Sequence, residues 1–317
     1  LGSRGLGDVY KRQVNLLCPR QGLRCCALFA DLECKLKEVF FFMPKNKNTL
    51  LLVLPRNEKS TAMPPLWASQ NFLTSRAIIH RLIQRTNLTK NDHVIEIGPG
   101  KGHITRALLE RCCHVTAVEL DRALYLRLTE QFKGAANLTL RNADFCSFSL
   151  PAKGPYKVFA NIPFSRTTDI IRRLTECRTP PTDAYLILEK GAAKRFMGQP
   201  RETLRSLSLK PFFKMEILYH FRREDFHPKP SVDIVMLHIA KRAHPDLPAA
   251  SARAYRAFLA KAYDGKTGLV GLFTRRQLSR ALGEAGLTHD TTLASIRYIQ
   301  WLCLFRCYAQ QVLRHKF

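Results

Sequence analysis

The chain has 317 residues, of which 46% are hydrophobic, and this is enough to bury one sizeable core and a smaller domain. Its 51 lysines and arginines against 25 aspartates and glutamates give a formal net charge of +26, which favours a polyanionic partner such as nucleic acid over a basic surface kept only for solubility. No apolar run of about 18 residues occurs, which excludes a hydrophobic membrane span, and charges within residues 23–42 exclude a signal-peptide core there.

The ten cysteines are predicted to be reduced thiols. Cys25-Cys26 and Cys112-Cys113 are adjacent pairs, the others are scattered, and no C-x-x-C spacing occurs. The pattern therefore argues against a zinc site or a disulfide framework, and we expect no metal and a cytoplasmic protein.

We interpret residues 1–42 as a leader that is not native. The first thirteen residues look like translated adapter or vector sequence, and the following thirty show no clear periodicity. Residues 43–66 are expected to form a basic, flexible lead-in, with Met43 or Met63 as the native start.

Strands and helices are predicted to alternate from Gln70 onward, in a catalytic domain over residues 67–240. Thr74 or Ser75 can cap a first helix, whose apolar residues at positions 78, 79, 82 and 83 share one face. The segments that follow, in chain order, are strand 93–97, helix 103–112, strand 115–120, helix 122–132, strands 138–142 and 157–161, helix 168–178 and strand 184–189. This alternation predicts an α/β fold, with a parallel sheet covered by helices on both faces.

Residues 214–221 and 232–240 resemble an antiparallel strand pair that closes the edge of the sheet. Residues 241–317 change to a helical pattern and carry 13 lysines and arginines against 4 aspartates and glutamates, a net charge of +9. We therefore predict a small, basic, helical domain over residues 241–317 that holds a folded RNA.

A glycine loop follows the first long strand. Gly98, Gly100 and Gly102 stand where strand turns into helix, which permits a tight turn and close approach of a ligand. The spacing G-x-G-x-G would by itself fit an ordinary turn equally well. Glu119 and Asp144 end the next two strands, where carboxylates can accept hydrogen bonds from a ribose diol and an adenine amino group.

Asn161-Ile162-Pro163-Phe164 ends the fourth strand in this order and carries the chemistry. The lone pair of adenine N6 is delocalised into the ring, and two acceptors, the Asn161 side-chain oxygen and the Ile162 carbonyl, can orient it toward a sulfonium methyl. Pro163 stiffens the turn, and Phe164 offers a face for a flipped base. The alternative is a strand that ends in a proline turn with a buried Phe.

Phe226-His227-Pro228-Lys229-Pro230 lies between the two late strands and permits two interpretations. Phe226 could cover the second face of the base while Lys229 reaches a phosphate. The segment could equally be a proline-rich hairpin loop with a core Phe.

With these residues in view, the chain resembles the Erm family of ribosomal RNA adenine N6-methyltransferases over about four-fifths of its length, from Gln70 onward. Gln70-Asn71-Phe72-Leu73 resembles the opening motif of the family, which lies over the cofactor methionine. The motifs that match in order after it are residues 96–102, Glu119, residues 142–145, residues 161–164 and residues 226–230.

The resemblance implies a Rossmann-like class I methyltransferase sheet that uses S-adenosyl-L-methionine. It implies cofactor binding by Gln70, Asn71, Leu73, Gly98, Gly100, Gly102, Glu119, Leu120, Asp144, Phe145 and Asn161. The catalytic residues it implies are Asn161, Ile162, Pro163, Phe164 and Phe226.

The implied substrate is one adenine of 23S rRNA, methylated once or twice by a monomeric enzyme before the subunit is fully assembled. Resistance to macrolides, lincosamides and streptogramin B would follow. One departure is Phe164, where many Erm enzymes carry Tyr, so a hydroxyl is lost while stacking survives.

Three alternatives compete with this interpretation. The 16S rRNA dimethyltransferase KsgA usually reads Asn-Leu-Pro-Tyr where this chain has Asn161 to Phe164. DNA adenine methyltransferases usually carry an acidic residue or Ser and a double Pro in this motif. A non-catalytic RNA-binding factor with the same fold would have no need for an intact cofactor pocket.

Overall fold

The computed structural model describes residues 72–313, with side chains up to residue 311. The expected leader and lead-in, together with Gln70 and Asn71 of the opening motif, lie outside the described residues. All described elements belong to the compact unit Ala62–Phe317.

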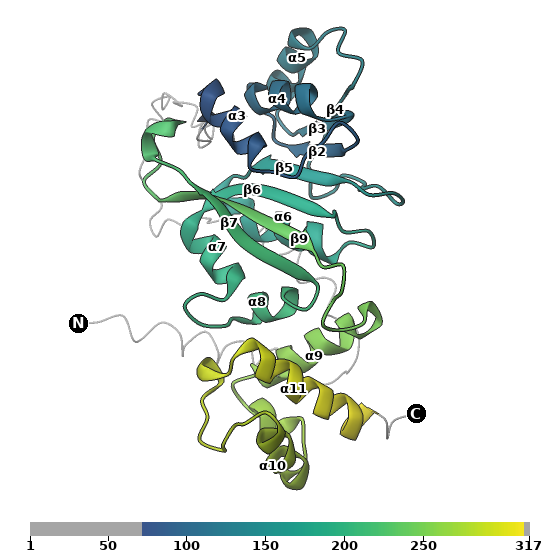
Figure 1. The fold of residues 1–317 in the computed structure, drawn as a ribbon, viewed down its shortest axis with the longest axis vertical. Coiled ribbons are helices and arrows are strands. Elements are labelled where there is room, and N and C mark those ends of the chain that lie inside the picture. The colour runs from purple at the N-terminus through teal and green to yellow at the C-terminus, as the bar shows by residue number, and fades with distance from the viewer. Residues whose placement is uncertain (1–71, 314–317) are drawn as a thin grey trace, which may run out of the picture. The chain divides into compact units, whose positions relative to one another are not determined.

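A seven-stranded sheet lies at the centre of the described fold (Figure 1). The order is β4-β3-β2-β5-β6-β9-β7; strands β2 to β6 are parallel, and β9 is antiparallel to both of its neighbours. The strands are β2 (His93–Ile97), β3 (His114–Glu119), β4 (Leu138–Asn142), β5 (Lys157–Asn161), β6 (Asp183–Glu189), β7 (Phe213–His220) and β9 (Ile234–Lys241). The predicted α/β fold and the antiparallel pair at the sheet edge are confirmed, with β7 as the outermost strand.

Helices cover both faces of the sheet. They are α3 (Arg76–Gln84), α4 (His103–Arg111), α5 (Arg122–Gln131), α6 (Thr167–Glu176), α7 (Lys190–Met197) and α8 (Leu204–Leu209). Strand β5 shows the two faces: Phe159 belongs to the cluster with α3 and α4, whereas Val158 and Ala160 belong to the cluster with α6 and α7. Such strands, buried on both faces, read as continuous apolar runs, and this is why the sequence indicated a parallel sheet.

The first helix begins where a hydroxyl can cap it. The Ser75 Oγ accepts a hydrogen bond from the Ile78 backbone N at 3.4 Å, so Ser75 and not Thr74 is the cap. Helix α6 runs from Thr167 to Glu176, whereas residues 168–178 were predicted, because Cys177 adopts an extended backbone. No element was predicted for residues 190–212, and α7 and α8 occupy most of that segment.

The C-terminal segment is helical in the described part of the chain, as predicted. Its helices are α9 (Ala252–Ala262), α10 (Arg275–Glu284) and α11 (Tyr298–Tyr308), and they follow the end of β9. They enclose a cluster of their own built on aromatic side chains, and Leu207 of α8 joins it beside α9 (Figure 1). No helix among the described residues has the length and apolar character needed to cross a membrane.

A short two-stranded sheet lies apart from the central one. Strand β1 (Phe72–Leu73) pairs antiparallel with β8 (Phe226–His227), and Leu73 faces Phe226 in the register. The opening motif and the late proline-rich segment, distant in sequence, are therefore neighbours in the fold.

Candidate active site

The carboxyl ends of β2, β3, β4 and β5 form one edge of the sheet. Strand β2 pairs with β3 on one side and with β5 on the other. After β2 the chain first adds β3 and β4 on one side of it, and then returns to add β5 and β6 on the other side. This is the topological switch point at which doubly wound sheets bind ligands. Backbone hydrogen bonds continue past the strands, from Gly98 N to Val118 O and from Ala143 N to Glu119 O, each at 3.0 Å.

The glycine loop after β2 has a backbone that side chains would strain. Gly98 and Gly100 have φ values of +64° and +57°. A Cβ atom at Gly100 would lie 2.9 Å from the Phe72 ring, whereas a Cβ at Gly98 would have no heavy atom within 4 Å. Because Gly100 has no Cβ, the Phe72 ring of the opening motif can pack against the loop. Gly98 borders open space and lines the cavity described below.

Glu119 ties two of these loops together. Its Oε2 atom accepts a hydrogen bond from the Gly100 backbone N and its Oε1 atom accepts one from the Asp121 backbone N, both at 3.0 Å. Glu119 is 3% exposed, and burial raises the pKa of its carboxyl although both backbone donors favour the charged form. Each oxygen keeps a second lone pair, so the carboxylate can still accept from a ribose diol.

A cavity opens between the loops after β2, β3, β4 and β5. Its walls are mainly apolar, with carboxylates at two points, and the residues that line it are Ile97, Gly98, Val118, Glu119, Leu120, Ala143, Asp144, Phe145, Cys146, Pro163, Ser165, Arg166 and Ile170. Leu120 is 49% exposed, whereas Phe145 is buried as part of the core. Pro163 and five of the residues predicted to bind the cofactor therefore line one cavity, and its apolar walls with two carboxylates suit a flat base and a ribose. The five are Gly98, Glu119, Leu120, Asp144 and Phe145.

Asp144 has a partner that the sequence analysis missed. The Arg166 Nη2 atom lies 3.2 Å from Asp144 Oδ2 and 3.1 Å from the Cys146 sulfur. The Asp144 Oδ1 atom also accepts from the Cys146 backbone N at 2.8 Å. Among 51 lysines and arginines, nothing in the sequence singles out Arg166, because the contact depends on where the turn after β5 ends.

Asn161 to Phe164 occupy the end of β5. Asn161 is half-buried, and the Ile162 backbone N donates to Ile187 O at 3.0 Å, so the sheet pairing extends one residue past the strand. Pro163 has φ −58°, and Phe164 opens a turn of 3₁₀ helix (Phe164–Arg166) with 39% of its surface exposed. The Phe164 ring is thus accessible beside a rigid strand end.

Phe226 is placed differently. It is 3% exposed, belongs to the cluster with α3 and α4, and its ring centroid lies 5.0 Å from that of Phe221. Of the two interpretations left open above, this position favours the core Phe. Lys229 lies on the surface with its Nζ atom 3.5 Å from a carboxylate oxygen of Glu224.

Glu96 is a second residue that the sequence analysis did not single out beyond its place in the loop motif. It is 2% exposed, and burial, together with the charge of Glu119, raises its pKa to about 8. Its Oε2 atom has no hydrogen-bond partner among the described residues. Glu96 does not line the cavity, and because successive strand residues point to opposite faces it lies on the other face of β2 from Ile97.

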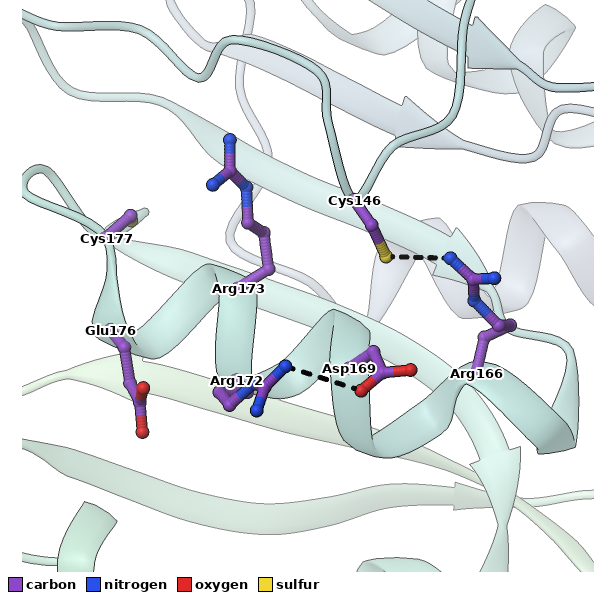
Figure 2. A pocket seen from close by; sticks show the side chains of 7 residues that line it. All are labelled: Cys146, Arg166, Asp169, Arg172, Arg173, Glu176 and Cys177. Atoms are coloured by element: carbon purple, nitrogen blue, oxygen red, sulfur yellow. Dashed lines mark hydrogen bonds and ion pairs between the residues drawn. The ribbon is translucent and has the colours of Figure 1, made fainter. Parts of the chain in front are cut away.

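A second hollow adjoins the first along α6 and shares Cys146 and Arg166 with it. Figure 2 shows Arg166 directed toward the Cys146 sulfur and Arg172 toward Asp169, whose Oδ1 lies 3.7 Å away. The remaining lining residues are Arg173, Glu176 and Cys177. The positive charge of its three arginines is therefore largely offset by the two carboxylates, Asp169 and Glu176.

Comparison with known proteins identifies the family. The family model for ribosomal RNA adenine dimethylase matches residues 68–310. The chain is 35% identical over 240 residues to an rRNA adenine N-6-methyltransferase of Limosilactobacillus reuteri, which covers 76% of this chain and 95% of that protein. A relative with the same name from Escherichia coli is 34% identical, with 76% and 94% covered.

Two solved structures share the fold. The 23S rRNA methyltransferase ErmE superposes with a TM-score of 0.68 at 30% identity, over 76% of this chain and all of that one. A dimethyladenosine transferase from Plasmodium falciparum superposes with a TM-score of 0.55 at 20% identity, over 77% and 89% of the two chains. The chain belongs to the ribosomal RNA adenine dimethylase family, and it is an S-adenosylmethionine-dependent methyltransferase that acts on adenine N6 of ribosomal RNA.

Proposed function

We propose that this enzyme methylates N6 of one specific adenine in 23S rRNA. The observation that carries the proposal is Asn161-Ile162-Pro163-Phe164, held at the end of β5 beside the cavity, in a chain 30% identical to a 23S rRNA methyltransferase. The relative at 20% identity supports only the fold.

The cavity residues divide the binding of the cofactor between them. Glu119 accepts from the ribose, Asp144 accepts from the adenine amino group, and Leu120 and Phe145 line the space for the base. The cofactor, when bound, supplies an electrophilic sulfonium methyl group. The ion pair of Asp144 with Arg166 is more than 40% exposed on both sides, and such pairs contribute only about 0–1 kcal/mol, so a ligand amino group can compete with it.

The strand end positions the target amine. The Asn161 side-chain oxygen and the Ile162 carbonyl accept from the two hydrogens of adenine N6, which turns the nitrogen lone pair toward the methyl group. Pro163 and the backbone bond of Ile162 to Ile187 keep this turn rigid, as positioning catalysis requires. Phe164 stacks on the flipped base, an interaction worth about 1–3 kcal/mol.

The biological setting follows from the substrate. Methyl groups on an adenine of the peptidyl-transferase region obstruct the binding of macrolides, lincosamides and streptogramin B, so the enzyme would confer resistance to them. We further propose that it acts as a monomer on rRNA that is not yet fully assembled into the subunit.

Mapping the methylated nucleotide tests the choice of RNA. The full chain is incubated with tritiated S-adenosylmethionine and, separately, with protein-free 23S and 16S rRNA, and the label is located. Label on a single adenine of 23S rRNA supports the proposal. Label confined to 16S rRNA overturns it in favour of an enzyme of the KsgA type.

Asn161→Ala tests the assigned chemistry. Losing one positioned hydrogen-bonding group at a reacting centre reduces kcat by about 10²–10³, and RNA affinity should stay unchanged. Asn91→Ala, an exposed asparagine just before β2, is the matched control and should retain full transfer. Undiminished transfer by Asn161→Ala would remove this residue from the mechanism.

A further inference from the structure

A cationic pocket lies next to the glycine loop and shares no lining residue with the cavity described above. It is lined by side chains from the start of α3, the loop itself, α4 and α5, and these residues are Arg76, Lys101, His103, Arg106, Arg127 and Gln131. We call this set the α4–α5 pocket. Neither the assigned cofactor residues nor the Asn161 turn includes any member of it.

The α4–α5 pocket holds four cations and no carboxylate. None of the four forms an ion pair with an acidic side chain within the described part of the chain, where the ion pairs of other residues are numerous. The hollow along α6 in Figure 2 differs, because Asp169 and Glu176 line it together with its arginines. Uncompensated cations that converge on one concave site are the arrangement expected for an anionic ligand.

Two of the cations are held in place by aromatic rings. The Lys101 Nζ lies 4.9 Å from the centroid of the Phe72 ring, and the Arg106 guanidinium carbon lies 5.5 Å from that of Phe132. Helix α4 begins at His103, so the positive end of its dipole points toward the same pocket. Although His103 is exposed, partial desolvation and the surrounding cations lower its pKa, which favours the neutral imidazole, and this form can donate one hydrogen bond.

We propose that the α4–α5 pocket binds a backbone phosphate of the RNA substrate, as a contact separate from the basic C-terminal helices; this rests on the proposed function. All six lining residues are exposed, as a site for a long polymer requires. Lys101 lies between Gly100 and Gly102, so the bound phosphate is anchored on the loop that also forms the cofactor site. RNA seated there would extend along the same sheet edge as Asn161.

The test uses Arg106→Gln/Arg127→Gln, which removes two cations without altering the glycine loop. Binding to 23S and to 16S rRNA is measured between about 50 and 200 mM salt. Loss of neutralisation of this one phosphate should reduce the magnitude of the slope of log K against log salt by about 0.7–0.9 in the double variant, and binding should weaken about tenfold at physiological salt. Arg106→Lys/Arg127→Lys should keep most of the slope, because the charges remain.

Lys153→Gln/Arg178→Gln is the control with the same charge change. Both residues are exposed and precede the starts of β5 and β6, at the opposite edge of the sheet. The slope of this control should match that of the wild type, and the affinity of every variant for S-adenosylmethionine, measured by calorimetry, should be unchanged. Equal slopes for wild type and Arg106→Gln/Arg127→Gln on both RNAs would overturn the proposal.

A small anion is the competing occupant, and thermal stability in millimolar pyrophosphate or inorganic phosphate detects it. If the double variant loses stabilisation by these anions while its RNA slope stays intact, the pocket holds a free phosphate compound and the proposal fails. The slope is measured on both RNAs, so a methylated adenine found in 16S rRNA would refute the proposed 23S target and leave this inference standing.

Discussion

At the scale of single residues, the site depends on a few positions with no tolerance for change. The glycine loop has to pass under the Phe72 ring, and Glu119 has to receive two backbone N–H groups at once. Neither requirement concerns the bulk of the core. Substitutions at these positions should therefore weaken ligand binding in addition to any loss of stability.

Gly100→Ala should weaken cofactor binding, and Gly134→Ala should not. Both glycines have positive φ, +57° and +88°, so an added Cβ costs each about 1–2 kcal/mol of stability. Only at Gly100 would the Cβ also meet the Phe72 ring and displace the loop. Cofactor titration with denaturant unfolding checks this; equal affinities in the two variants would contradict the predicted role of the loop.

Phe164 and Phe226 should respond to alanine in opposite ways. Phe226→Ala empties a buried position and should lower the free energy of unfolding by about 3–5 kcal/mol. Phe164→Ala changes an exposed ring and should alter stability by less than about 0.5 kcal/mol. If Phe164 stacks on the base, the same change should lower kcat/KM by a factor of about 5–150, equivalent to 1–3 kcal/mol. Urea unfolding and transfer kinetics on both variants test the assignment; a stable but inactive Phe226→Ala enzyme would restore that residue to the base site.

At the scale of elements, a polar network joins the amino end of β6 to its neighbours. Asp183 Oδ1 accepts from Asn87 Nδ2 at 3.1 Å and lies 2.9 Å from His238 Nε2 on β9. The Tyr185 hydroxyl donates to Asn87 Oδ1 at 2.7 Å, and its ring stacks on His238. The network links β9 and the segment after α3 to β6, at the edge of the sheet opposite the active site.

This network predicts a loss of stability in acid. Burial acts to raise the pKa of Asp183, but hydrogen bonds with His238 and Asn87 outweigh it and hold the pKa below 3.8. A depressed pKa means that the stabilisation is complete above the unfolded value, about 3.9, and is lost as pH falls through the lower folded value. The difference in unfolding free energy between wild type and Asp183→Asn should be present at about pH 5 and shrink below about pH 4. Urea titrations at each pH measure it, and a difference that persists unchanged at the lowest pH would exclude Asp183 as the titrating group.

Elements with a local signature could be predicted, and contacts between distant segments could not. Strands β2, β4 and β5 begin and end at the predicted residues. Burial on both faces explains the apolar residues of β2 and β5, whereas β4, at the edge of the sheet, is only partly buried. Helix α7, for which no element was predicted, follows β6 without a break and contains Gly191, a residue that disfavours helix interiors. The pairing of β1 with β8 and the contact of Arg166 with Asp144 depend on tertiary structure that no short window of sequence contains.

At the scale of the whole molecule, the described residues combine a closely packed, mainly apolar sheet with exposed lysine and arginine side chains. The formal charge of the chain is +26, and within the part that the structure describes the buried charged side chains, Glu96, Glu119 and Asp183, are all acidic. The positive charge is therefore available to solvent and to a polyanion. Association with RNA should be governed by counterion release.

RNA affinity should fall steeply with salt, whereas cofactor affinity should not. If about six or more phosphates are contacted, affinity for rRNA drops by about 10³ or more between 50 and 200 mM salt. Cofactor binding, confined to an apolar slot, should change by less than about twofold over that range. Filter binding and calorimetry across the salt series measure both quantities, and an rRNA affinity that is flat in salt would contradict phosphate-dominated binding.

The place of β9 in the sheet differs from its place in the chain. Strand β9 lies between β6 and β7, although it is the last of the three to leave the ribosome. Until Ile234–Lys241 emerges, β6 presents an open edge to the cell, and β7 has no partner in the sheet. A nascent chain thus contains the Asn161 turn before β9 can pair with β6 and β7. A pause in translation between β7 and β9 would leave the edge of β6 unpaired and prone to aggregation.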